Sequence, residues 1–187
     1  YYALNSKVTT TTRAVATLGF NSVKSILIAT SVSSTLNQDL KIYGYGKGGL
    51  WAHSLACAAI AKLIGQKVYH MNDEQVEELF IAGLLHDIGK IAIAPQLDIY
   101  KDELKNFQID ESFTLIEKAE ENILGISHPE VGRILSAKWN LSEDLQSAIS
   151  KHHFESENQF NSIIRISDMI CHENMVGLSD NFKWLQK

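Results

Sequence analysis

The stretch LLHDIGK, residues 84–90, places a histidine and an aspartate side by side at the end of an apolar segment. The preceding run EELFIAGLL, which starts at Glu77, predicts a helix that ends at His86 and Asp87. Gly89 follows, and a glycine just past a helix often takes the left-handed conformation that ends it. An imidazole beside a carboxylate is a donor set that suits a divalent metal. A lone His-Asp pair is more often a hydrogen-bonded pair near the core, so the metal interpretation needs further ligands.

Together with the His-Asp pair, the ligand-type residues in apolar segments with helical spacing include five of the seven histidines. These residues are His53 in LWAHSLACAAIAKLIG, His86, His128 in GISHPEVG, His152 and His153 in SAISKHHFE, and Asp168 in IIRISDMI. Helices that bury the apolar faces of these segments would project the histidines and the aspartate inward. The His-Asp pair therefore has enough potential partners for a metal site.

Helical patterns follow one another with short connections, and no alternating strand pattern of convincing length is present. We expect helices to begin near Asn21, Trp51, Asn72, Pro95, Ser112, Pro129, Ser142 and Asn161. Proline is expected in a first helical turn because the N–H groups of that turn have no partner within the helix, so the lack of an N–H costs nothing there. The sequence predicts an all-α fold. We expect residues 1–187 to form a single domain that lacks N-terminal residues of the full protein, because the chain starts without methionine.

Two segments outside the apolar helices bear on the site. The expected helix 112–124 is highly charged, and we expect Glu117, Glu120 and Glu121 to lie mostly on its solvated face, with Gly125 ending the helix. The stretch DLKIYGYGKGG, residues 39–49, has four glycines within six positions, which predicts a loop. The loop lacks the GKS/T ending of a phosphate-binding loop, so we interpret it as a connector at the edge of the site.

The composition excludes several classes of protein. The net charge is −5, from 17 Lys+Arg against 22 Asp+Glu, and without a basic stripe we expect no direct nucleic-acid partner. The two cysteines, Cys57 and Cys171, stand in apolar segments without CxxC spacing, which predicts reduced core thiols in a cytoplasmic protein. The apolar runs are shorter than the roughly 20 residues that a membrane span needs, so we expect no membrane association.

The order His, His-Asp, His-Pro, His-His, Asp is similar to that of the HD superfamily of metal-dependent phosphohydrolases. The flanking segments LWAHSLACAAIA, ELFIAGLLHDIGK, SHPEVGRIL and WNLSEDLQSAISKHH resemble those of the HDOD domain, a bacterial signalling relative of the HD-GYP domain. The resemblance implies an HD-like helical bundle with a central metal-site cleft.

The resemblance also implies two ligand sets that share one carboxylate. His53, His86, Asp87 and Asp168 would form one cation site, and Asp87, His128, His152 and His153 a second. Mixed histidine and carboxylate ligands favour one or two divalent transition-metal ions, such as Fe, Mn, Zn or Ni, over Ca or Mg.

Two functions are compatible with such a site. A hydrolase acting on a phosphomonoester, a phosphodiester or a nucleotide would use Asp87 and Lys90 in catalysis, since Lys90 matches the HDxGK lysine of HD-GYP proteins; the alternative for Lys90 is a solvated cation at a helix end. The stretch after His153 lacks the GYP motif, and Gly49 stands where trimetal relatives have a glutamate. We therefore favour a signalling or output module with a protein partner. His172 lies one turn after Asp168, where it could be a peripheral ligand or a hydrogen-bond partner of that aspartate, and we favour the hydrogen-bond role.

Overall fold

The structure is a computed structural model that describes residues 15, 19–104 and 116–179. The described helices are α2 (Phe20–Leu36), the 3-10 helix η1 (Lys41–Tyr43), α3 (Gly49–Lys67), α4 (Asp73–Leu85), α5 (Ile88–Ile99), α7 (Ile116–Leu124), α8 (His128–Lys138), α9 (Glu143–Lys151) and α10 (Gln159–Glu173). Within these residues only isolated bridges pair extended backbone, Leu40 with Tyr45 and Tyr45 with Leu178. The prediction of an all-α fold is confirmed. The first residues of the helix expected from Ser112 lie outside the described part.

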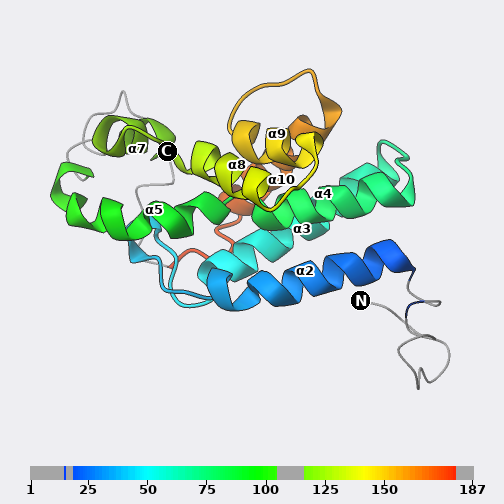
Figure 1. Cartoon of the computed structure of the whole chain (residues 1–187), viewed down its shortest axis with the longest axis horizontal. Helices are drawn as coiled ribbons and strands as arrows, with labels where there is room; N and C mark the ends of the chain where they lie inside the picture. The colour runs from blue at the N-terminus through cyan, green and yellow to red at the C-terminus, as the bar shows by residue number, and fades with distance from the viewer. Residues whose placement is uncertain (1–14, 16–18, 105–115, 180–187) are drawn as a thin grey trace.

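The bundle is organised around α3 and α4, which pack along each other (Figure 1). α10 packs on α3, α9 lies against α4, α8 and α10, and α8 packs on α5. α2 runs along the other side of the α3–α4 pair and contacts α4. No helix in the described ranges combines the length and the apolar character that a membrane crossing requires.

Two groups of buried apolar side chains form the core, and the last turn of α4 belongs to both. Leu84 packs with Leu50, Ile88 and Leu97 in one group. Its neighbour Leu85 belongs to the other group, which α9 and α10 supply with Ile149, Ile163 and Ile164 among others. Because both groups anchor this turn, the His-Asp pair that follows it is held at the centre of the molecule.

Local signals explain where several helices begin and end. Asn72 caps α4 through a reciprocal pair of hydrogen bonds with Gln75, and the side chain of Ser142 caps α9. Gly125 follows α7 with a φ of 74°, a conformation that favours glycine. These three signals were expected from the sequence and are confirmed.

Two expected boundaries are wrong. Gly89 does not end the helix that carries the His-Asp pair, because α4 already ends at Leu85 and Gly89 lies in the first turn of α5. A Cβ on Gly89 would lie 2.0 Å from the carbonyl oxygen of His128, so the missing side chain lets α8 approach α5. Pro95 lies inside α5 instead of opening a helix, since α5 begins at Ile88.

Candidate metal centre

Five helical segments bring the expected ligand residues to one place. His53 projects from the N-terminal part of α3, and His86 and Asp87 form the sharp connection between α4 and α5. His128 begins α8, His152 and His153 follow α9, and Asp168 lies within α10. All seven side chains meet in the interior, in overlapping groups whose ligand atoms lie within 4.8 Å of one another.

The first group gathers around Asp168. Its Oδ1 lies 3.1 Å from Nε2 of His53 and 3.4 Å from Nε2 of His86, and the two nitrogens are 3.3 Å apart. Oδ2 of Asp87 lies 3.7 Å from Nε2 of His53 and 3.5 Å from Nε2 of His86. Both carboxylates therefore approach the same pair of imidazole nitrogens.

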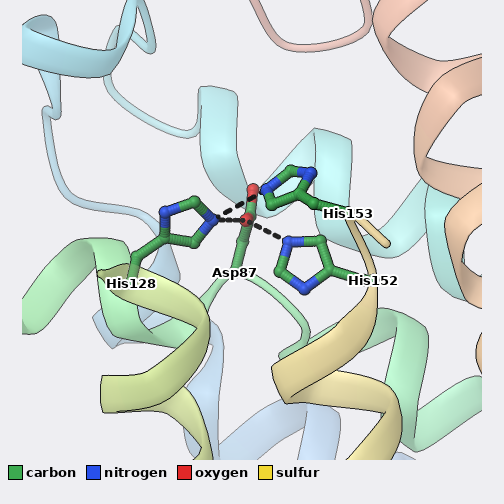
Figure 2. Close-up of side chains that lie close together, drawn as sticks. All are labelled: Asp87, His128, His152 and His153. Carbon is green, nitrogen blue, oxygen red and sulfur yellow. Dashed lines mark hydrogen bonds and ion pairs between the residues drawn. The ribbon is translucent and has the colours of Figure 1, made fainter. Parts of the chain in front are cut away.

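The second group surrounds the other oxygen of Asp87 (Figure 2). Oδ1 lies 3.3 Å from Nε2 of His128 and 3.6 Å from Nε2 of His152. Nε2 of His153 lies 3.1 Å from Nε2 of His128. Asp87 thus directs one oxygen to each group, as a carboxylate that bridges two cations would.

The spacing of these atoms can be compared with metal coordination. Atoms bound at about 2.1 Å to one ion lie roughly 3.0–3.4 Å apart, depending on whether the geometry is octahedral or tetrahedral. The pairs of ligand atoms described above are 3.1 Å to 3.7 Å apart. These pairs are therefore spaced almost as they would be around a bound ion.

Hydrogen bonds from the other ring nitrogen orient several of these histidines. Nδ1 of His86 donates to the carbonyl oxygen of Gly83 at 2.8 Å, and Nδ1 of His152 donates to that of Ile149 at 2.7 Å. With the proton on Nδ1, each Nε2 keeps a lone pair that points to the centre.

Glu120 was not among the expected site residues, and its position corrects the sequence analysis. Glu120 is completely buried, and its Oε2 accepts hydrogen bonds from both the backbone nitrogen and Nδ1 of His128. Its Oε1 accepts a hydrogen bond from the hydroxyl of Tyr43 at 2.7 Å. The sequence held a signal, because Glu120 falls at helical spacing between the apolar residues Ile116 and Ile123.

Glu117 is also buried, contrary to expectation, whereas Glu121 is exposed as expected. The Oε2 of Glu117 lies 4.0 Å from Nε2 of His153, and neither of its oxygens has a hydrogen-bond partner. Burial raises the pKa of Glu117, and the nearby His128 only partly offsets this effect. α7 therefore turns two carboxylates toward the second group, because its apolar side packs on the core beside them.

The charge state of the cluster differs between its members. Burial opposes ionisation of Asp87, but Lys90 and the surrounding histidines outweigh it and hold the pKa of Asp87 well below its usual range. Burial lowers the pKa of both His152 and His153, whereas in His86 and His128 the attraction of Asp87 and of Glu120 outweighs burial and raises the pKa. His152 and His153 are therefore neutral beside an ionised carboxylate, the state in which these groups bind metals, and a metal that bound His86 and His128 would displace their protons.

The sequence was compared with protein families. The HDOD domain family matches residues 1–154. The chain belongs to the HDOD family. No curated protein matches the chain significantly. The matched segment of the HDOD domain includes six of the seven expected ligands, and Asp168 follows it in α10.

Two solved structures share the fold of this HDOD domain. The crystal structure of an HDOD domain protein with unknown function from Geobacter sulfurreducens is 26% identical, with a TM-score of 0.70, over 97% of this chain and 62% of that one. A protein from Shewanella amazonensis SB2B described as a "Putative phosphohydrolase" is 20% identical, with a TM-score of 0.73, over 89% of this chain and 60% of that one. This HDOD chain therefore spans about three fifths of the length of either protein.

The residues of this HDOD domain fit a metal centre. Oδ1 of Asp87 and Nε2 of His152 are buried and have no hydrogen-bond partner, although both belong to the second group. Burying such atoms without a partner is costly, and ligation of a cation would satisfy them. Imidazole nitrogens combined with carboxylate oxygens favour divalent transition metals.

Lys90 forms a buried ion pair, which neither of the two roles suggested by the sequence included. Its Nζ donates to Oδ2 of Asp87 at 2.6 Å and lies over the rings of Tyr43 and Tyr45, at 5.6 Å and 5.7 Å from their centres. Lys90 is 3% exposed, so it is not a solvated cation at a helix end. Residues 39–49, which we expected to border the site, do lie beside it, since they contain both tyrosines.

The two histidines outside the expected ligand set differ. His70 is exposed between α3 and α4, away from the cluster. His172 lies beside the cluster, with Nε2 3.3 Å from Oδ1 of Asp168. Burial lowers the pKa of His172 to about 4, so its ring is neutral at physiological pH. The cysteines Cys57 and Cys171 are buried free thiols, as expected.

Proposed function

We propose that this HDOD domain is a signalling or output module of the bacterial cytoplasm that binds a protein partner and holds one or two divalent transition-metal ions in its core. The family supports the signalling role, and the burial of the centre carries the choice between signalling and hydrolysis. A centre that is closed to solvent can stabilise and report a conformation, whereas a hydrolytic centre must admit its substrate.

The burial is nearly complete. The side chains of His53, His128 and His152 are not exposed at all, and those of Asp87 and Asp168 are 1% and 5% exposed. A groove of about 780 Å³ lies between α2, α3 and α4, but none of the seven expected ligands lines it. The burial of the ligands themselves supports a centre that would have to open before a phosphoester could reach it.

The ions would be held by this chain's own residues as two adjacent sets. His53, His86, Asp168 and one oxygen of Asp87 would hold the first, and His128, His152, His153 and the other oxygen of Asp87 the second. Glu120 would orient His128 through Nδ1 and increase the basicity of its Nε2. In such a module the metal stabilises the packing of the ligand-bearing helices, because it binds only the folded arrangement.

A second candidate is a metal-dependent phosphohydrolase that acts on a phosphomonoester, a phosphodiester or a nucleotide. The shared carboxylate of Asp87 favours it, because two adjacent cations can activate a water and bind the oxygens of a phosphoester. In this case Asp87 and Lys90 would act in catalysis, with Lys90 released from its ion pair to meet the phosphate. His153, with 14% of its side chain exposed, lies closest to the surface among the expected ligands.

Turnover distinguishes the two candidates. The purified chain is loaded with Fe, Mn, Zn or Ni and assayed on a panel of phosphomonoesters, phosphodiesters and nucleotides, with Asp87→Asn as the matched variant. A signalling module shows no metal-dependent turnover, while metal loading raises its melting temperature. Turnover by the wild type that is lost in Asp87→Asn, with the helical content intact by circular dichroism, would establish the hydrolase instead.

A further inference from the structure

Three imidazole nitrogens converge on one carboxylate oxygen in this centre. Oδ1 of Asp168 lies 3.1 Å from Nε2 of His53, 3.4 Å from Nε2 of His86 and 3.3 Å from Nε2 of His172. A carboxylate oxygen has about two lone pairs, so it cannot accept good hydrogen bonds from three ring N–H groups at once. Donor atoms that crowd together in this way are typical of ligands that share a cation.

The backbone of α10 places His172 on the same side as Asp168. The two residues are separated by one helical turn, which aligns their side chains on one face of the helix. The ring of His172 also lies beside that of His53, with the ring centres 4.9 Å apart. Ligand atoms of His53, Asp168 and His172 lie within 4.8 Å of one another, so the three residues form a potential metal-binding group of their own.

We propose that His172 is a direct ligand of the first cation, which would then be held by His53, His86, His172, Asp87 and Asp168. The inference rests on the proposed metal centre and extends it beyond the four ligands that the sequence analysis assigned. It also replaces the earlier interpretation of His172 as a hydrogen-bond partner of Asp168. His172 lies on the solvent side of the group, with 26% of its side chain exposed, so it would cover the first cation.

With His172 as a ligand, the two cation positions differ in their number of protein ligands. The first cation would then have five protein ligands, whereas the second group supplies four, Asp87, His128, His152 and His153. Each position has three imidazoles, which favour borderline ions such as Zn²⁺ and Ni²⁺ over Mg²⁺ at both. The first ion should therefore bind more tightly, and chelators should remove the second ion first.

The affinity of the first ion tests the proposal. Metal-free wild type, His172→Ala, His172→Gln and the control His70→Ala are titrated with Zn²⁺ in competition with a chromophoric chelator. We expect both His172 variants to lose about tenfold or more in affinity for the first equivalent, a typical cost at metal sites, while His70→Ala matches the wild type. Glutamine can still donate a hydrogen bond to Asp168, so wild-type affinity in His172→Gln would overturn the proposal.

A spectroscopic measurement identifies the ligand in the wild-type protein itself. Protein with isotopically labelled histidine rings is loaded with a magnetic cadmium isotope, and the signal of His172 is assigned by its absence in His172→Gln. Scalar coupling between Nε2 of His172 and cadmium is the expected result, because it requires a direct bond. If the wild type binds cadmium and His172 shows no coupling, this inference is wrong while the metal centre stands. Failure of the wild type to take up any transition metal would overturn both.

Discussion

Glu120 accepts two hydrogen bonds from His128 through one oxygen, since its Oε2 lies 2.7 Å from the backbone nitrogen and 2.7 Å from Nδ1 of that histidine. The contact fixes both the start of α8 and the orientation of the imidazole. Burial raises the pKa of Glu120, but the charge and the hydrogen bonds of His128 outweigh burial. The pKa of Glu120 therefore lies below its usual value. A charged carboxylate at this position makes His128 a stronger donor to a metal.

Removing the charge of Glu120 should weaken the metal centre without removing a ligand. We expect Glu120→Gln to lower the affinity for the second ion by about 10- to 100-fold, because the amide is a weaker acceptor for Nδ1 of His128. Competition with a chelator measures the change. The exposed Glu121 on the same helix provides the control, and equal losses in Glu120→Gln and Glu121→Gln would contradict the assigned role.

The two aspartates of the centre should differ in how many ions depend on them. Asp87 faces both groups with ring nitrogens 3.3–3.7 Å from its oxygens, whereas Asp168 has such short contacts only in the first group and comes no nearer to His153 than 4.0 Å, through Oδ2. Asp87→Asn should therefore reduce the content of both ions, and Asp168→Asn that of the first alone. Elemental analysis of protein purified without chelators measures the stoichiometry. Retention of both ions by Asp87→Asn would show that this carboxylate does not bridge them.

The close approach of α8 to α5 should depend on Gly89. A Cβ at this position would lie 2.0 Å from the carbonyl oxygen of His128, which is backbone and cannot rotate away. We expect Gly89→Ala to destabilise the fold by about 1–3 kcal/mol, typical of overpacking, and to weaken metal binding by displacing His128. Urea denaturation and metal content measure the two effects. Gly46→Ala is the matched control, because its Cβ would meet nothing within 4 Å.

Away from the centre, Lys62 and Glu77 form a buried ion pair between α3 and α4. Glu77→Gln would leave the charge of Lys62 without its partner, and we expect it to cost about 3 kcal/mol, the lower end of the range for such pairs because both residues line the groove. Equilibrium unfolding in urea at neutral pH measures the loss. The exposed pair Glu130–Arg133 serves as a control, and Glu130→Gln should change stability much less.

The same ion pair predicts a pH dependence. Burial raises the pKa of Glu77, but hydrogen bonds from Lys62 and Ser22 outweigh burial, so its pKa lies below 4.5 in the folded state. A lowered pKa contributes stability above the unfolded value, and this contribution is lost as the pH falls through the folded value. The difference in unfolding free energy between wild type and Glu77→Gln should therefore narrow below about pH 4.5. A difference that stayed constant from pH 7 to pH 3 would show that the charge of Glu77 contributes nothing.

Local patterns in the sequence determined the fold class, most of the helices and the identity of the seven clustered side chains. Apolar residues at helical spacing carry this information, because a helix must bury its apolar face whatever its neighbours are. The caps at Asn72 and Ser142 are equally local, since each bonds to backbone within its own first turn.

Only the tertiary structure decided which face of each helix meets the site. Glu117 and Glu120 look like solvated charges in a charged helix, and they are buried because α7 packs beside His128. Gly89 reads as a helix terminator, and its actual role is to admit the backbone of His128. The convergence of His172 with His53 and Asp168 likewise depends on how α10 lies against α3. Contacts between distant helices are set by the packing of the whole core, and no short segment of sequence contains that information.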